Sequence, residues 1–128
     1  METDKIRALE SKAQTFLRSA AVLLELEDFD SCASRAYFAM FFSVQALLLH
    51  ETASLPSKQG IRTAFLERYV DSGRLPSRAG EALQRAADLQ ELGDYGYGHA
   101  VSQPDAEYVL QEAEAFVNSL ARLIEVSA

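Results

Sequence analysis

The sequence predicts an all-α fold, an up-and-down bundle of about five helices. Apolar residues recur at three- and four-residue steps along most of the chain, which lines one face of an α-helix, and no segment is a convincing strand. The connections are short, so consecutive helices are expected to pack largely antiparallel. With 128 residues and 48% hydrophobic residues, residues 1–128 are predicted to form a single domain with its own core.

The first two predicted helices flank an acidic turn. The apolar stripe of the first helix ends in the acidic run ELEDFD, residues 25–30. Asp28 or Asp30 is expected to cap the second helix, because a short side-chain oxygen can accept hydrogen bonds from the free N–H groups of the first turn. The second helix, roughly residues 30–51, is apolar on all sides in its middle and is therefore predicted to lie at the centre of the bundle.

Three further helices are separated by loops that contain Pro, Gly or Ser. The third is marked by Ile61 and is predicted to stop at Gly73, because a residue free to take positive φ ends helices well. Ser77 is expected to cap the fourth helix, which should end at Gly93. Ser102 occupies the cap position of the fifth helix, and acidic residues follow near the positive end of its dipole.

Charge and cysteine content exclude several classes of protein. The net charge of −7 argues against a broadly basic, phosphate-tracking surface, although it permits a local basic patch. Cys32 is the only cysteine, and the opening METDKIRALE has charges where a secretory signal needs an apolar run, so a cytoplasmic location is expected. The apolar stretch 36–49 is interrupted by Ser43 and Gln45 and is short for a bilayer, so no membrane association is predicted.

No metal or cofactor site is predicted from residue spacing. The carboxylates of residues 25–30 lack the glycine and the terminal bidentate ligand of a calcium loop. The chain has no phosphate-binding glycine loop, no zinc-type Cys/His spacing and no serine nucleophile elbow. The aromatic residues at 37–42 lie at helical spacing and fit a core better than a base-stacking surface. His50, near the end of the second helix, fits a cation beside the last carbonyl groups.

Candidate binding residues lie near the loops. Arg35 begins the apolar second helix and should either pair with a carboxylate, the favoured interpretation, or face an anion. Lys58, Gln59 and Gly60 stand at the start of the third helix, where free N–H groups could bind an anion. Helix initiation alone explains these three residues about as well.

The stretch ELGDYGYGHAV, residues 91–101, has two interpretations. As a joint, its glycines let the backbone leave one helix and enter the next, with Tyr95 and Tyr97 packed against the bundle ends. As a site, it presents Asp94, Tyr95 and His99, of which His99 could act as a base. The joint is the favoured interpretation, and the two can coexist.

Four segments occur in a distinctive order. They are SRAYFAMFFSVQALLL, SKQGIRTAFLERYVDSGRLPSRAGEAL, LQELGDYGY and AEYVLQEAEAFVNSL. Together, from about Asp30 to Leu123, they resemble the HEPN (higher eukaryotes and prokaryotes nucleotide-binding) family, in particular its small stand-alone bacterial and archaeal members. The resemblance implies a compact α-helical bundle that is a single HEPN-like domain.

The resemblance also implies an assembly and a chemistry. Such proteins are commonly homodimers and often work beside a minimal nucleotidyltransferase as a toxin and antitoxin pair. Active members are metal-independent ribonucleases that need no cofactor. Their site uses an arginine followed after about four to six residues by a histidine, and the dimer brings two copies into one cleft. The imidazole can move a proton near neutral pH while the guanidinium holds the phosphate.

The catalytic pair of the family is not matched in this sequence. Relatives tend to carry arginine about four residues before an Asp-Tyr pair. Here the Asp94-Tyr95 pair is present, but Gln90 stands at the arginine position. No arginine lies at the family spacing before either His99 or His50. The candidates for a catalytic role are therefore only His99, Asp94, Tyr95 and Gln90, and the sequence favours a protein without ribonuclease activity of the familiar kind.

Three functions follow from these observations. The favoured one is a non-catalytic or degenerate nucleotide- or RNA-associated module that dimerises and binds a nucleotidyltransferase. The second is a ribonuclease toxin with a rearranged site that uses His99 with Lys58 or Arg35, and the third is an adaptor bundle without a ligand. The family mode would put the second and fourth helices at the border of a dimer cleft. The candidate binding residues are Arg35, Lys58, Gln59, Gly60 and Tyr97.

Overall fold

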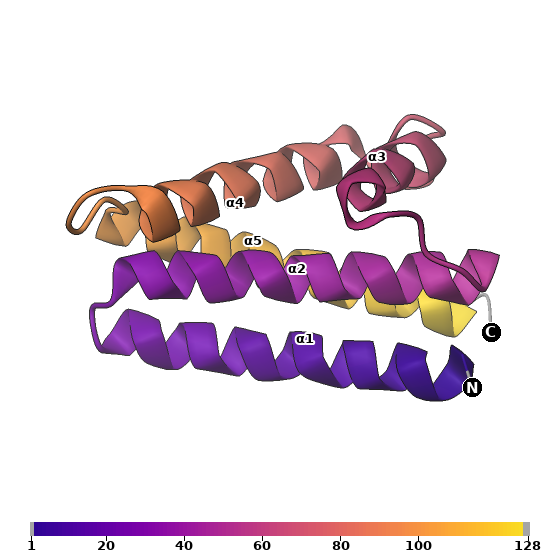
Figure 1. The fold of residues 1–128 in the computed structure, drawn as a ribbon, viewed down its shortest axis with the longest axis horizontal. Helices are drawn as coiled ribbons and strands as arrows, with labels where there is room; N and C mark the ends of the chain where they lie inside the picture. The colour runs from indigo at the N-terminus through magenta and orange to yellow at the C-terminus, as the bar shows by residue number, and fades with distance from the viewer. Residues whose placement is uncertain (1, 127–128) are drawn as a thin grey trace.

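The computed structural model describes residues 2–126, which form an antiparallel bundle of helices without a strand among them (Figure 1). The two ends of the bundle are joined by long helices that run alternately in opposite directions. This arrangement confirms the predicted all-α bundle. The helices are α1 (Glu2–Glu25), α2 (Phe29–Thr52), η1 (Lys58–Gly60), α3 (Ile61–Phe65), η2 (Leu66–Val70), α4 (Ser77–Tyr95) and α5 (Gln103–Val126).

Helix α2 is the central element. It packs against α1, α4 and α5, and Figure 1 shows it between α1 and α4 with α5 behind. Met40, Ala46 and Leu48 are all fully buried, although their positions in the sequence place them on different sides of the helix. With 24 residues, α2 is longer than the apolar stretch seen in the sequence and could span a membrane by length and composition, but 67% of its most apolar window is buried in the bundle. Its apolar character is explained by this burial.

The two aspartates of the acidic turn before α2 have different roles. Asp28 is the cap residue, and its side chain accepts a hydrogen bond of 3.2 Å from the backbone N–H of Ser31. Asp30, the other residue expected as a cap, lies inside the first turn of the helix. Its carboxylate is therefore free to bind a different segment, as described below.

Helix α4 differs from the prediction at both ends. Its cap residue is Pro76, while Ser77 is already helical, and the helix continues beyond Gly93 to Tyr95. A Cβ atom at Gly93 would lie 3.1 Å from both the Cα and the carbonyl oxygen of Asp30. Gly93 is thus required by the close approach of α4 to the start of α2, and it does not end the helix.

Between α2 and α4 the helical part ends earlier than predicted, and its last turn is a π-helix, which is wider than an α-helix. The helical turns end at Val70, and Gly73, with φ of +85°, lies in the following turn. In η2 the backbone N–H of Asp71 donates to the carbonyl of Leu66, five residues earlier, at 2.8 Å, which is the spacing of a π-helix. The sequence pattern contains no sign of this extra residue in the turn.

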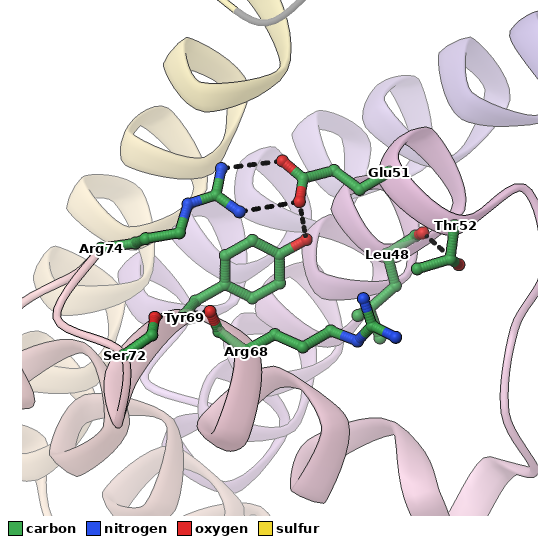
Figure 2. Close-up of polar contacts among 7 residues, drawn as sticks. All are labelled: Leu48, Glu51, Thr52, Arg68, Tyr69, Ser72 and Arg74. Carbon is green, nitrogen blue, oxygen red and sulfur yellow. Dashed lines mark hydrogen bonds and ion pairs between the residues drawn. The ribbon is translucent and has the colours of Figure 1, made fainter.

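A polar cluster fixes this segment to the end of α2 (Figure 2). The carboxylate of Glu51 accepts two hydrogen bonds of 2.8 Å from Arg74 and one of 2.9 Å from the hydroxyl of Tyr69. The guanidinium of Arg74 also lies 4.8 Å from the centre of the Tyr69 ring. The hydrogen bonds from Arg74, together with the one from Tyr69, lower the pKa of Glu51. Because Tyr69 is fully buried, Glu51 supplies the acceptor that its hydroxyl needs.

We expect Glu51→Gln to lower the free energy of unfolding by about 1 kcal/mol at pH 7, a value kept small because Arg74 is partly exposed. The folded-state pKa of Glu51 lies below its unfolded value, so its stabilisation is present above about pH 4.3 and is lost as the pH falls through the folded pKa. Urea unfolding at pH 7 and in acid measures the difference.

The matched control is Glu67→Gln, which removes the same charge from an exposed position on η2. The difference between Glu51→Gln and the unchanged protein should shrink in acid, whereas the control should change little at pH 7. A difference that is the same at both pH values would contradict the assigned role of the ionised carboxylate.

Candidate functional site

A groove runs along the face of α2 that the other long helices leave uncovered. It consists of three adjoining hollows of about 340, 580 and 440 Å³, and the ring of Phe38 lines all three. We call them the α3 hollow, between α2, α4 and the η1–α3 segment; the α1 hollow, towards α1; and the loop hollow, towards residues 55–58. Together they form the α2 groove.

Aromatic side chains of α2 form the floor of this groove. Tyr37 and Phe41 are buried, as expected for core residues, but Phe38 and Phe42 are only half-buried. Both rings still pack against the buried core, as the sequence predicts, but each keeps part of its surface exposed. Phe42 packs edge-on against Phe16 of α1, with ring centres 5.0 Å apart. The groove thus presents aromatic surface to solvent.

Arg35 lies in the α1 hollow. Its guanidinium is 4.8 Å from the ring centre of Phe16, and it takes part in no ion pair within residues 2–126. The expected carboxylate partner is therefore not found. Asp94 lines the same hollow but is held by other donors. The charge of Arg35 is left facing the groove, next to an aromatic ring that favours a cation.

Asp94 joins α2 to α4 at the edge of the groove. Its Oδ2 atom accepts a hydrogen bond of 2.7 Å from Gln90 and one of 3.1 Å from the hydroxyl of Ser34. Because α4 continues through Tyr95, Gln90 and Asp94 lie one turn apart on the same helix face. The structure thus brings two of the sequence candidates together, and adds Ser34, which the sequence analysis missed.

The loop after α4 is held by Asp30. The carboxylate accepts hydrogen bonds from the backbone N–H groups of Ala100, at 3.2 Å, and Val101, at 2.8 Å. Asp30 therefore anchors this loop and does not cap α2, because its position inside the helix turns its side chain across to the loop. At Gly96 a Cβ atom would meet the carbonyl oxygen of Leu92, so the loop backbone lies directly on the end of α4.

The remaining loop candidates stay outside the groove. Tyr95 and Tyr97 are 80% and 102% exposed, so the expectation that they pack against the bundle end was wrong. The backbone, not these side chains, lies against the bundle, because Asp30 binds the loop through its amide groups. His99 is also exposed and lines none of the three hollows. It does not meet Lys58 or Gln90 across the groove.

The α3 hollow gathers cationic and amide side chains. Lys58 and Gln59 lie exposed at its rim, and the half-buried Arg62 lies beside the hydroxyl of Tyr37. Burial raises the pKa of Tyr37, and the neighbouring guanidinium of Arg62 opposes that rise. Arg62 was missed by sequence reasoning, although its place four residues after Lys58, one helical turn further on, was a usable signal.

The backbone N–H of Gly60 takes part in helix initiation, one of the two roles that the sequence left open for it. This N–H donates to the carbonyl of Ser57 at 2.8 Å, which closes the short helix η1. The amide is therefore already satisfied, and α3 itself is only five residues long. An anion at this end of the groove therefore does not use the N–H of Gly60.

Residues 2–126 contain neither a group of metal-ligating side chains nor an activated thiol. No three His, Cys, Asp or Glu side chains of this part of the chain are grouped so as to hold a metal ion. Burial, with a smaller effect of Asp28, raises the pKa of the Cys32 thiol to about 11. The thiol is therefore protonated near neutral pH and is a poor nucleophile.

Comparison with known proteins finds one family model and several relatives, each of which matches most of this chain. The family model described as the HEPN domain matches residues 6–123. A UPF0332 protein of Thermotoga maritima is 30% identical over 89% of this chain and 86% of its own length. A UPF0332 protein of Gloeobacter violaceus is 33% identical over 90% of this chain and 92% of its own length. The protein named "Putative toxin MJ0142" of Methanocaldococcus jannaschii is 25% identical over 94% of this chain and 82% of its own length.

A solved structure shares the fold. The crystal structure of TT1696 from Thermus thermophilus superposes with a TM-score of 0.76 and covers 92% of this chain and 97% of its own. Its sequence identity is 18%. The likeness supports the arrangement of helices and carries no information on activity.

We expect Asp30→Ala to release the loop that follows α4. The amides of Ala100 and Val101 would lose their acceptor, so their hydrogen exchange should become about tenfold faster, the effect of losing a hydrogen bond of about 1.4 kcal/mol. Amide exchange followed by NMR measures this. Asp88→Ala, which removes an exposed carboxylate from α4, serves as the control. Unchanged exchange at both amides in Asp30→Ala would show that the carboxylate does not hold the loop.

Proposed function

The chain belongs to the HEPN domain family, and from that premise we propose that it is a non-catalytic member of toxin–antitoxin type. In this proposal it binds a nucleotide or RNA, forms a homodimer and pairs with a minimal nucleotidyltransferase. The toxin–antitoxin type is supported by the names of two relatives from Methanocaldococcus jannaschii, "Putative toxin MJ0142" and "Putative toxin MJ0605".

The absence of catalysis rests on one observation, the hydrogen bond between Gln90 and Asp94 at the edge of the α2 groove. Gln90 stands at the position where the resemblance to the family implies an arginine, and its neutral amide cannot neutralise the charge that develops on a phosphate during RNA cleavage. Neither His50 nor His99 lines any of the three hollows. The groove therefore lacks both the guanidinium at the family position and an imidazole to move a proton.

Ligand binding is supported by the lining of the same groove. Arg35, Lys58 and Gln59 line it and supply cationic and amide groups, and half-buried Phe38 supplies an aromatic face on which a base can stack. Tyr97 lies outside the groove and the amide of Gly60 is already hydrogen-bonded. In the proposal the binding surface therefore includes Arg35, Lys58 and Gln59. Tyr97 and Gly60 contribute little.

Dimerisation is supported by the apolar surface of the groove. The half-buried ring of Phe42 adjoins Leu55, which is 37% exposed. A second copy that covers part of this surface would remove it from water, which favours association. Two copies of the groove would then face one cleft.

We expect purified protein to leave RNA intact in the presence of EDTA, and His99→Ala to behave in the same way. EDTA inhibits contaminating metal-dependent nucleases, and a metal-independent ribonuclease added to a parallel sample confirms that the RNA can be cut. Gel electrophoresis of the RNA is the measurement. Cleavage by the unchanged protein that disappears in His99→Ala would contradict the proposal and support a ribonuclease with a rearranged site.

We expect light scattering after size exclusion to give twice the chain mass of 14.1 kDa at micromolar concentration. Phe42→Glu should shift the protein towards the monomer, because it puts a charge into the apolar part of the cleft. Val22→Glu, at an exposed site on α1, is the control and should stay dimeric. Unchanged protein that is monomeric at micromolar concentration and above would overturn the dimer.

A further inference from the structure

We propose that the α3 hollow is a phosphate-binding subsite, in which Arg62 and Lys58 hold the phosphate group of a nucleotide or of RNA while the attached base lies against Phe38. The inference rests on the proposed function and deepens it. It assigns the central contact to Arg62, a residue outside the positions that the family pattern marks.

The hollow has the size and the lining for a phosphate group. Its volume is about 340 Å³, and three separate parts of the chain form its walls. Helix α2 contributes Tyr37 and Phe38, the η1–α3 segment contributes Lys58 and Arg62, and α4 contributes Gln90. Donor groups therefore face one space from different directions, as the recognition of a tetrahedral anion requires.

The local charge is opposite to that of the whole chain. The protein has a net charge of −7, yet the cations that line the α2 groove, Arg35, Lys58 and Arg62, outnumber the carboxylates, which are Glu91 and Asp94. In an acidic protein, a groove with this balance attracts anions to one place.

The two cations of the α3 hollow have no carboxylate partner in the part of the chain that the structure describes. Arg74, Arg78 and Arg85 each form an ion pair, but Lys58 and Arg62 do not. Glu91 lines the hollow from an exposed position, where solvent and salt screen its charge. The two cations are therefore available to a ligand.

Arg62 is the better placed of the two cations. It is half-buried and lies beside the hydroxyl of Tyr37, which restricts its guanidinium, whereas Lys58 is exposed. A guanidinium has five N–H donors and binds two phosphate oxygens at once, so a contact with Tyr37 leaves donors free for the ligand. Lys58 adds a mobile charge at the rim.

The neighbouring hollows are less suited to a phosphate. The α1 hollow is lined by one cation, Arg35, and one carboxylate, Asp94, so it has no excess of positive charge. The loop hollow is lined mainly by apolar side chains, with Lys58 as its one charged residue. Since Phe38 lines all three hollows, a base attached to a phosphate in the α3 hollow can stack on its ring.

The test is binding of two probes, adenosine diphosphate and a short single-stranded oligoribonucleotide, to the dimeric full chain. Arg62→Gln should weaken binding about tenfold, the expected loss for a hydrogen-bonded charge. Lys58→Gln should weaken it less, by about threefold, because the side chain is exposed. Arg122→Gln makes the same charge change on α5, away from the groove lining, and should change the affinity by less than about twofold.

Circular dichroism verifies that each variant is folded. If Arg62→Gln does not fold, Lys58→Gln still tests the subsite, because Lys58 is exposed. Weaker binding of either probe supports the subsite. Weakening with both probes means that it takes any phosphate group, weakening with RNA alone means that it takes an internal phosphate, and weakening with the diphosphate alone means that it takes a terminal one. If both variants bind like Arg122→Gln, the subsite is overturned while the proposed function stands. If the unchanged protein binds neither probe, both the subsite and the proposed binding of nucleotide or RNA are overturned.

Discussion

The burial of α2 between α1, α4 and α5 is the constraint on which the rest of the structure depends. A helix covered by three neighbours can carry only apolar or small side chains on its covered sides, since a buried polar group without a partner is costly. Between its two ends, α2 can therefore present polar and aromatic groups to solvent along its open strip. That strip carries Ser34, Arg35, Phe38 and Phe42, all of them half-buried or exposed, and the α2 groove follows it.

Polar contacts fix the two ends of this groove. At one end, Asp30 holds the loop after α4, and Asp94 joins α4 to α2. At the other, Glu51 holds Tyr69 and Arg74, which fixes the segment that follows Arg62 (Figure 2). The residues that line the groove thus lie on elements that are anchored to α2, and this preorganisation reduces the entropy that a ligand must offset on binding.

Periodicity was sufficient to predict the fold, because the stripes of the long helices and the apolar character of α2 reflect burial directly. The site was predicted only in part. Gln90, Asp94 and Lys58, which the sequence analysis names as candidates, line the α2 groove, and their functional roles stay predictions. Three contacts escaped the sequence because they join distant segments: Asp30 binds amides 70 and 71 residues away, Gly93 approaches Asp30 across the bundle, and Arg62 meets Tyr37 of another helix. Exposure of the loop tyrosines could not be inferred from their apolar rings.

The most direct test of the α2 groove as the working surface is an NMR titration of isotope-labelled protein with a single-stranded oligoribonucleotide. Amide and side-chain signals of residues 58–62 and 90–94 should shift, because these residues border the groove from both sides. The hollow between α4 and α5, beside the Arg78–Glu112 ion pair, provides an internal reference and should not respond. Shifts concentrated at that hollow, with residues 58–62 and 90–94 unchanged, would contradict the assignment.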